Sequence, residues 1–293
     1  MKLTVLIIGC GDIGINLGRE LLEEGHQVIG LRRNVEALEG TGIKPLKLDL
    51  NDLEDAEPSS LPQADYVVYT VSADRFEESA YQAAYPEGLK RVLRIMEQHK
   101  TPPRRVFFVS STSVHGQQEG EVVNEETPPD STSFSGTLMC EAEQALINHS
   151  LPGTVIRFSG IYGPGRDRLI HQVAEGRVAA ITPVVYSNRI HRDDCTGIIA
   201  HLIRYQESGE TLADIYLGSD CEPVTMHNVM MWLAKQLNVE ASETMQSPLR
   251  RRTSKRCDNQ RIVSTGYQFR FPSYREGYAQ VLKEGGFLEV NKA

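Results

Sequence analysis

The chain has 293 residues, of which 40% are hydrophobic and 24% are charged, a balance that is usual for one globular protein of moderate size. Its net charge of −8 at pH 7 argues against a nucleic-acid-binding protein, because such proteins present clustered positive charge. No apolar run approaches the length of a membrane-spanning helix. The five cysteines are scattered, without a Cys-x-x-Cys pair or a His/Cys cluster, so we expect reduced thiols, a cytoplasmic location and no metal site.

The first predicted element is a strand that runs into a glycine-rich turn. An apolar run over residues 5–8 precedes glycines with Gly-x-Gly-x-x-Gly spacing, and an amphipathic stretch covers residues 13–22. Such a strand, turn and helix N-terminus bind a pyrophosphate on backbone N–H groups. The motif alone is weak evidence, but a second strand over residues 27–31 follows at the right spacing. The residues expected to bind the cofactor here are Gly9, Gly11, Asp12, Ile13 and Gly14.

The end of the second strand indicates which dinucleotide is bound. NAD-binding sites place a carboxylate about 20 residues past the glycines to accept hydrogen bonds from the ribose. Here the position holds Arg32, with Arg33 beside it. A guanidinium binds a 2′-phosphate through paired charged hydrogen bonds. We therefore expect NADP rather than NAD, although two arginines could also simply solvate a strand end.

The remaining elements alternate between strands and helices as far as about residue 160. Strands are predicted at 45–48, 66–70, 105–110 and 154–158, and helices at 81–98 and 136–148. Later elements are a helix at 194–205, a strand at 214–217, and helices at 226–237 and 273–283. This order predicts an α/β, Rossmann-type doubly wound parallel sheet with helices on both faces. We expect a nucleotide-binding domain at 1–160, re-entered at about 188–218, and a smaller C-terminal substrate-binding subdomain at 161–187 and 219–293.

Three later segments resemble one family. Residues 109–116 read Val-Ser-Ser-Thr-Ser-Val-His-Gly, residues 157–165 read Arg-Phe-Ser-Gly-Ile-Tyr-Gly-Pro-Gly, and residues 189–194 read Arg-Ile-His-Arg-Asp-Asp. In this order they resemble motifs of the extended short-chain dehydrogenases/reductases, the NAD-dependent epimerase/dehydratase family. The resemblance implies an NAD(P)-dependent reaction at a hydroxyl or carbonyl group. It also places Asp49 and Leu50 beside the adenine, and we add Val71, after the fourth strand, to the cofactor-binding set.

One departure from that family concerns its catalytic pair. The family uses Tyr-x-x-x-Lys, in which the tyrosine exchanges a proton with the substrate and the lysine lowers its pKa. If Glu141 is matched to the family's glutamate, the lysine position holds Thr137 and the tyrosine position holds Ser133. A shift of one residue offers Phe134 and Leu138. The usual acid/base pair is therefore absent, as in an atypical branch of the family.

Other polar side chains are candidates for the chemistry. The resemblance assigns Ser111 to the reacting oxygen, and we also consider His115 and Tyr162 as catalytic residues. Each of the three could instead have a purely structural role. The expected substrate-binding residues are Thr112, Ser113, Arg166, Arg189, His191 and Arg192. The arginines, together with Arg168 and Arg250 to Arg252, favour an anionic substrate such as a phosphorylated or nucleotide-linked sugar.

Two functions remain open from the sequence. The first is an NADP-dependent oxidoreductase or epimerase/dehydratase-like enzyme, and the second is a non-catalytic NADP-binding sensor or regulatory module. The fold alone does not decide between these two functions, so the residues of the site have to decide between them. Besides the small-molecule substrate, we expect a homodimer through the helices at 81–98 and 136–148, where Leu138, Ala142 and Leu146 form an apolar stripe. A stripe that faces the core would look the same. We expect no nucleic-acid and no membrane partner.

Overall fold

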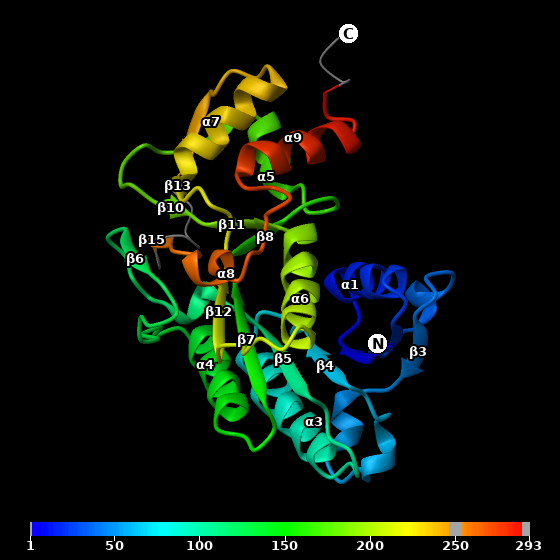
Figure 1. Cartoon of the computed structure of the whole chain (residues 1–293). Coiled ribbons are helices and arrows are strands. Elements are labelled where there is room, and N and C mark those ends of the chain that lie inside the picture. The colour runs from blue at the N-terminus through cyan, green and yellow to red at the C-terminus, as the bar shows by residue number, and fades with distance from the viewer. Residues whose placement is uncertain (1, 246–253, 289–293) are drawn as a thin grey trace. The chain divides into compact units, whose positions relative to one another are not determined.

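The computed structural model describes residues 2–245 and 254–288 (Figure 1). The chain divides into two compact units. The first, here called the Rossmann unit, comprises Met1–Val114, Thr132–Arg157 and Thr196–Tyr216. The second unit comprises His115–Ser131, Phe158–Cys195 and Leu217–Ala293. This division differs from the expected domains, because residues 115–131, 158–160, 188–195 and 217–218 belong to the second unit. Arg250 to Arg252 lie outside the described residues.

A seven-stranded sheet has the order β12-β7-β5-β4-β1-β2-β3, and its neighbouring strands from β5 through to β3 pair in parallel. The strands are β1 (Thr4–Ile8), β2 (Gln27–Arg32), β3 (Lys44–Lys47), β4 (Tyr66–Tyr69), β5 (Arg105–Ser111), β7 (Gly153–Phe158) and β12 (Ile215–Gly218). The chain passes from β1 to β2 and β3 on one side, and then to β4, β5, β7 and β12 on the other. The strand order therefore reverses at β1, and ligands bind at such a switch point, beyond the carboxyl ends of the strands.

Helices cover both faces of this sheet (Figure 1). The helices of the Rossmann unit are α1 (Asp12–Glu23), α2 (Glu78–Gln82), α3 (Gly88–Glu97), α4 (Phe134–Ile147) and most of α6 (Arg192–Glu207). Because side chains alternate along a strand, Val67 packs in one core cluster with Leu89 of α3 and Met139 of α4. The neighbouring Tyr66 donates its hydroxyl to Glu207 of α6 at 2.7 Å on the opposite face. Both faces are buried, which explains the nearly continuous apolar strands.

The predicted helix at 81–98 is interrupted. Residues Ala83–Glu87 form one wide π-turn between α2 and α3, and Pro86 lies inside it. Proline has no N–H and its ring clashes with the preceding turn of an α-helix, so the chain widens there. The prediction of one continuous helix was wrong at this point because periodicity alone does not register the proline.

Shorter elements surround these helices. Five short helical turns in the Rossmann unit and its borders are η1 (Glu36–Leu38), η2 (Leu50–Leu53), η3 (Pro58–Ser60), η4 (Ala83–Glu87) and η5 (Thr112–Val114). In the second unit the strands are β6 (Glu121–Val123), β8 (Gly160–Tyr162), β9 (Arg177–Ala179), β10 (Tyr186–Ser187), β11 (Arg189–His191), β13 (Val224–Thr225), β14 (Glu243–Met245) and β15 (Lys255–Cys257). They form two-stranded ribbons that the sequence pattern did not predict, since each contains only two or three residues.

The second unit has its own core, to which three helices contribute. They are α5 (Arg168–Ala174), α7 (Met226–Leu237) and α9 (Tyr274–Glu284), and a short helix α8 (Gln260–Ser264) follows β15. One buried cluster contains Ile170, Val229, Leu233 and Val281. The apolar periodicity of the sequence in α7 and α9 predicts such a buried face on these helices. In the described part of the chain, no helix is both long and apolar enough to cross a membrane.

Candidate functional site

The glycine turn lies between β1 and α1. The N–H groups of Gly9 and Cys10 both donate to the carbonyl oxygen of Leu31 at 3.0 Å, which ties the turn to the end of β2. Gly11 is the N-cap of α1 and has no side chain with which to cap it. The first N–H groups of a helix have no partner within the helix, so those at this N-terminus are directed toward a ligand. With the helix dipole they form an anion-binding site.

Gly9 needs to be glycine for two reasons. Its φ of +80° is one that other residues rarely adopt, and a Cβ there would lie 2.6 Å from Cα of Val71. Thr70 further secures the turn, because its hydroxyl donates to the carbonyl of Gly9 at 3.0 Å. The loop after β4 therefore lies directly against the glycine turn. On this geometry Val71 is placed beside the expected phosphate site.

The two arginines at the end of β2 have different partners. Arg32 is half-buried and its Nη1 donates to the carbonyl oxygen of Cys10 at 3.2 Å, so its guanidinium lies next to the glycine turn. Arg33 is exposed and forms a paired contact with Asp74, with Nη1–Oδ2 and Nη2–Oδ1 distances of 2.7 and 2.6 Å. The carboxylate holds the pKa of Arg33 above its usual range. Asp74 could not be recognised as a partner from the sequence, because 41 residues separate it from Arg33.

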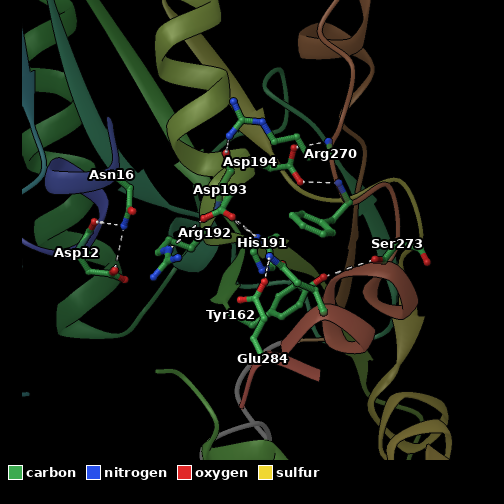
Figure 2. A network of polar contacts seen from close by, with 12 residues as sticks. Asp12, Asn16, Tyr162, His191, Arg192, Asp193, Asp194, Arg270, Ser273 and Glu284 are labelled. Atoms are coloured by element: carbon green, nitrogen blue, oxygen red, sulfur yellow. Dashed lines mark hydrogen bonds and ion pairs between the residues drawn. The ribbon is translucent and has the colours of Figure 1, made fainter. Parts of the chain in front are cut away.

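The remaining cofactor candidates follow β3 and begin α1. Asp49 caps the short helix η2, accepting from Asn51 N at 2.9 Å through Oδ1. Leu50 packs against the sheet core. Asp12 lies in the first turn of α1, where Asn16 donates to its carbonyl oxygen at 2.7 Å (Figure 2). Ile13 and Gly14 continue this turn, and Gly14 packs against Ile7, as a helix glycine close to its strand does.

Ser111 ends β5, close to the carboxyl edge of the sheet. Its Oγ accepts a hydrogen bond from Ser113 N at 3.1 Å, which stabilises the turn η5 and leaves its hydroxyl proton to donate. Thr112 is buried, with 7% of its surface exposed, and Ser113 is half-buried. In the Rossmann unit the structure therefore brings together the glycine turn, Arg32, Val71 and the end of β5 on parallel strands of one sheet.

In the second unit, Tyr162 and His191 are buried rather than open to a ligand (Figure 2). Tyr162 stacks on Tyr278 with 4.5 Å between ring centroids, and its hydroxyl lies so close to Gly277 that a Cβ there would clash with it. Burial lowers the pKa of His191 to about 4, and its Nδ1 accepts from Asp193 N at 3.2 Å. Both residues have clear structural roles, so the structure adds no support for Tyr162 as a proton donor.

The expected anion-binding arginines are in different environments. Arg189 is only 6% exposed and its Nη1 donates to the Tyr278 hydroxyl at 3.0 Å, which places it in the core of the second unit. Arg166 and Arg168 are exposed, and Arg192 pairs with the neighbouring Asp193 at 3.1 Å. The expected cluster is therefore not a uniform set: Arg189 stabilises the fold, while the others remain near the surface.

His115 also has a partner that the sequence did not indicate. It is fully buried, and its carbonyl oxygen accepts a hydrogen bond from Lys255 Nζ at 2.7 Å. Burial lowers the pKa of that lysine. Lys255 is 140 residues away from His115 in the sequence. The family's motif, which places its lysine in α4, therefore does not point to it. Among the described residues there is no group of three or more His, Cys, Asp or Glu side chains that could hold a metal ion.

Comparison with known proteins matches residues 5–218 to the model of the NAD-dependent epimerase/dehydratase family. A solved structure from Methylobacillus flagellatus that is assigned to the same class is 35% identical, with a TM-score of 0.79, over 98% of this chain and 100% of that one. This chain belongs to the NAD-dependent epimerase/dehydratase family. The predicted Rossmann-type fold is thereby confirmed. No curated protein matches the chain.

Two further structures of this family's fold carry bound nucleotides. The human epimerase family protein SDR39U1, solved with NADPH, is 18% identical with a TM-score of 0.77, over 96% of this chain and 99% of that one. MoeE5, solved with UDP-glucose and NAD, is 21% identical with a TM-score of 0.79, over 97% and 98% of the two chains. At these identities the likeness shows the fold alone.

The two glutamates of α4 that could anchor the frame of the family's catalytic pair lie in different environments. Glu141 lies on the outer side of α4 and forms an ion pair with Lys90 at 2.6 Å. Glu143, two residues later, is fully buried and pairs with Arg157, so it offers a second anchor for the frame. Counting back from Glu143 places Met139 at the lysine position and Ser135 at the tyrosine position. Neither is a tyrosine or a lysine, so the usual pair is absent in this frame as it is in the two frames taken from the sequence.

The first residues of α4 are used to begin the helix. Ser133 is its N-cap and its Oγ accepts from Gly136 N at 3.1 Å, while the Thr137 hydroxyl donates to the Ser133 carbonyl at 3.1 Å. These are ordinary capping contacts. Phe134 instead joins an aromatic group with Phe76 and Tyr81. Leu138, the remaining alternative from the sequence, is buried.

Proposed function

We propose that this protein is an NADP(H)-preferring oxidoreductase or epimerase/dehydratase-like enzyme acting on a hydroxyl or carbonyl group of a small, anionic, sugar-like substrate. The observation that carries the proposal is the juxtaposition of the glycine turn with Arg32, whose Nη1 contacts Cys10 O. The bound ligands described for two proteins of this fold, NADPH for one and UDP-glucose with NAD for the other, support the ligand class.

The residues of the Rossmann unit fit a nicotinamide dinucleotide. Gly9 leaves room at Val71 that a Cβ would fill, Gly11 exposes the N–H groups of α1 to a pyrophosphate, and Arg32 with Arg33 supplies positive charge at the ribose position. When bound, the dinucleotide supplies or accepts a hydride. The protein's part is to bind its adenosine half, orient it over the sheet and place the substrate oxygen near Ser111.

Ser111 is proposed to donate a hydrogen bond to the reacting oxygen, which stabilises charge that develops there. Thr112, Ser113, Arg166 and Arg192 are proposed to bind the substrate. His115, Tyr162 and His191 are buried, so we retain them as residues that shape the second unit rather than as proton donors. The group that takes the place of the family's tyrosine is not assigned.

A second candidate function is a dinucleotide-binding protein without catalysis. It is favoured by one observation: Ser133 and Thr137 serve to cap α4, and Met139, in the frame set by Glu143, has no ionisable group. Such a protein would bind the dinucleotide and report its redox state or occupancy to a partner.

One experiment distinguishes the two candidate functions from each other, and it also shows whether neither of them is correct. The purified protein is titrated with NADPH and NADH by calorimetry, and the absorbance of reduced nicotinamide is then followed with panels of carbonyl compounds and nucleotide sugars. Binding with consumption of NADPH supports the enzyme. Binding without consumption across the panels supports the non-catalytic protein, and a lack of binding of either dinucleotide would contradict both.

We also propose that the protein is a cytoplasmic homodimer. The cytoplasm is supported by the five cysteines, none of which forms a disulfide in the described part of the chain. The apolar stripe of α4 no longer supports the dimer, because Leu138, Ala142 and Leu146 are buried in the monomer core. Support comes instead from Phe76, which is 60% exposed beside Tyr81 and Phe134, since exposed aromatic groups are typical of interfaces.

A further inference from the structure

Asp74 holds the guanidinium of Arg33 by two parallel hydrogen bonds, with the geometry by which an arginine binds a phosphate. The side chains are 61% and 59% exposed, so the pair is accessible to a ligand. The pKa of Asp74 is lowered by its hydrogen bond to Arg33, so at neutral pH Asp74 is a carboxylate. One of the two arginines expected to read the 2′-phosphate is therefore already occupied by an anion of the protein.

The fold explains why this carboxylate reaches the site. The loop after β4 contains Val71, whose backbone lies against Gly9, and Asp74 follows on the same loop. Asp49, at the end of β3, adds further negative charge that acts on Arg33. Arg32, in contrast, donates to the neutral carbonyl of Cys10. The two neighbouring arginines thus differ in how freely they can bind an anion.

We propose that Asp74 sets the dinucleotide preference of this protein by competing with the 2′-phosphate of NADP(H) for Arg33. The inference rests on the proposed dinucleotide site and adds a specificity-determining residue to it. NAD(H) has an uncharged ribose hydroxyl at this position and leaves the Arg33–Asp74 pair intact. NADP(H) must displace Asp74 from Arg33 and then tolerate the displaced carboxylate near its phosphate. Asp74 therefore weakens the binding of NADP(H) but not that of NAD(H). As a result, the preference for NADP(H) over NAD(H) is smaller than the two arginines alone would produce.

The size of the effect follows from the exposure of the pair. Exposed ion pairs are worth up to about 1 kcal/mol, which corresponds to about fivefold in affinity. Relief of the repulsion between carboxylate and phosphate adds to this at low ionic strength, where screening is weak. We expect removal of the Asp74 charge to tighten NADP(H) binding about three- to tenfold.

The test is calorimetric titration of the full chain and of Asp74→Asn with NADPH and NADH at low and high salt. Asparagine has the shape of aspartate and removes only the charge. We expect Asp74→Asn to bind NADPH about three- to tenfold more tightly and NADH within about twofold of the original affinity, with the gain smaller at high salt. Adenosine 2′,5′-bisphosphate and AMP, which lack the nicotinamide half, should reproduce the difference. Asp55→Asn, an equal change of charge at another exposed position, should leave both affinities unchanged.

A double variant tests whether Asp74 acts through Arg33. In the Arg33→Ala background, Asp74→Asn should change the NADPH affinity less than it does in the original chain. An unchanged NADPH to NADH ratio in Asp74→Asn, or an equal gain in both backgrounds, would overturn the inference. If the unaltered chain binds neither dinucleotide, the proposed function fails; if it binds NADPH and Asp74→Asn does not shift the ratio, the role of Asp74 alone fails.

Discussion

Glu143 and Arg157 form an ion pair inside the Rossmann unit, with 2.7 Å between Oε2 and Nη2. Both side chains are buried, at 0% and 1% exposure, and Ser110 also donates a hydrogen bond to the same carboxylate at 2.6 Å. The pair joins α4 to β7, and Ser110 joins it to β5. Because charges in the interior are costly when they lose their partner, this pair gives the clearest stability prediction for the chain.

Glu143→Gln is expected to lower the free energy of unfolding by about 3–5 kcal/mol, because it leaves the Arg157 charge without its carboxylate. Urea denaturation followed by circular dichroism measures the change. Glu141→Gln is the matched control on the same helix; its exposed pair with Lys90 is worth no more than about 1 kcal/mol. Equal effects for the two variants would show that the buried pair has no special role.

Arg32→Asp is expected to reverse the preference from NADPH to NADH. A charged hydrogen bond to phosphate contributes about 1.5–3 kcal/mol, which is tenfold or more in affinity, and the new carboxylate adds repulsion. Titration with both dinucleotides measures the ratio, and Arg19→Asp, at an exposed position of α1, controls for the change in net charge. Tighter binding of NADH than NADPH by the unaltered protein would show that Arg32 does not contact the phosphate.

Ser111→Ala is expected to reduce turnover by about a hundredfold, the usual cost of losing one hydrogen-bond donor to a reacting oxygen, with little change in NADPH affinity. Steady-state rates and calorimetry on the same preparation test both parts. Ser59→Ala, the same change at an exposed position of η3, serves as the control. Loss of NADPH binding in Ser111→Ala would instead make Ser111 a cofactor-binding residue.

The stability of the second unit is expected to fall with acid because of His191. Its pKa is lowered to about 4 in the folded chain by burial, against about 6.5 when unfolded. The contribution of neutral His191 to the free energy of unfolding is complete above about pH 6.5. It is lost as the pH falls toward about 4, because the unfolded chain binds the proton at a higher pH than the folded chain does. The whole contribution is up to about 3 kcal/mol. Thermal unfolding of the original chain and His191→Gln between pH 5 and 8 should show a shallower pH dependence in the variant. Parallel curves would contradict the assignment.

Phe76→Ser is expected to shift the protein from dimer to monomer. Phe76 is 60% exposed and lies 4.9 Å from the ring centroid of Phe134, so removal of its ring takes away apolar area that a second copy would cover. Light scattering at micromolar concentration measures the mass of both proteins. A monomer in the unaltered protein would refute the dimer.

The sequence by itself determined the elements whose signals are local. The strand, the Gly-x-Gly-x-x-Gly turn and the helix of the N-terminus appear where they were predicted, and α7 has the predicted bounds of Met226 and Leu237. Each depends on apolar periodicity and backbone freedom within a dozen or so neighbouring residues. The family motifs, too, lie in continuous segments, which is why the family could be recognised before the fold was known.

Only the tertiary structure decided which distant side chains meet. Nothing local to Arg33 indicates Asp74, and nothing local to His115 indicates Lys255, because the chain brings each pair together over 41 and 140 residues. Glu141 and Glu143 are equally acidic in sequence, yet one faces solvent and the other Arg157, since two residues along a helix turn a side chain by more than half a circle. Burial, and with it the cost of an unpaired charge or the shift of a pKa, is a property of the packed chain, so the roles of Tyr162, His191 and Arg189 could be assigned only once their surroundings were seen.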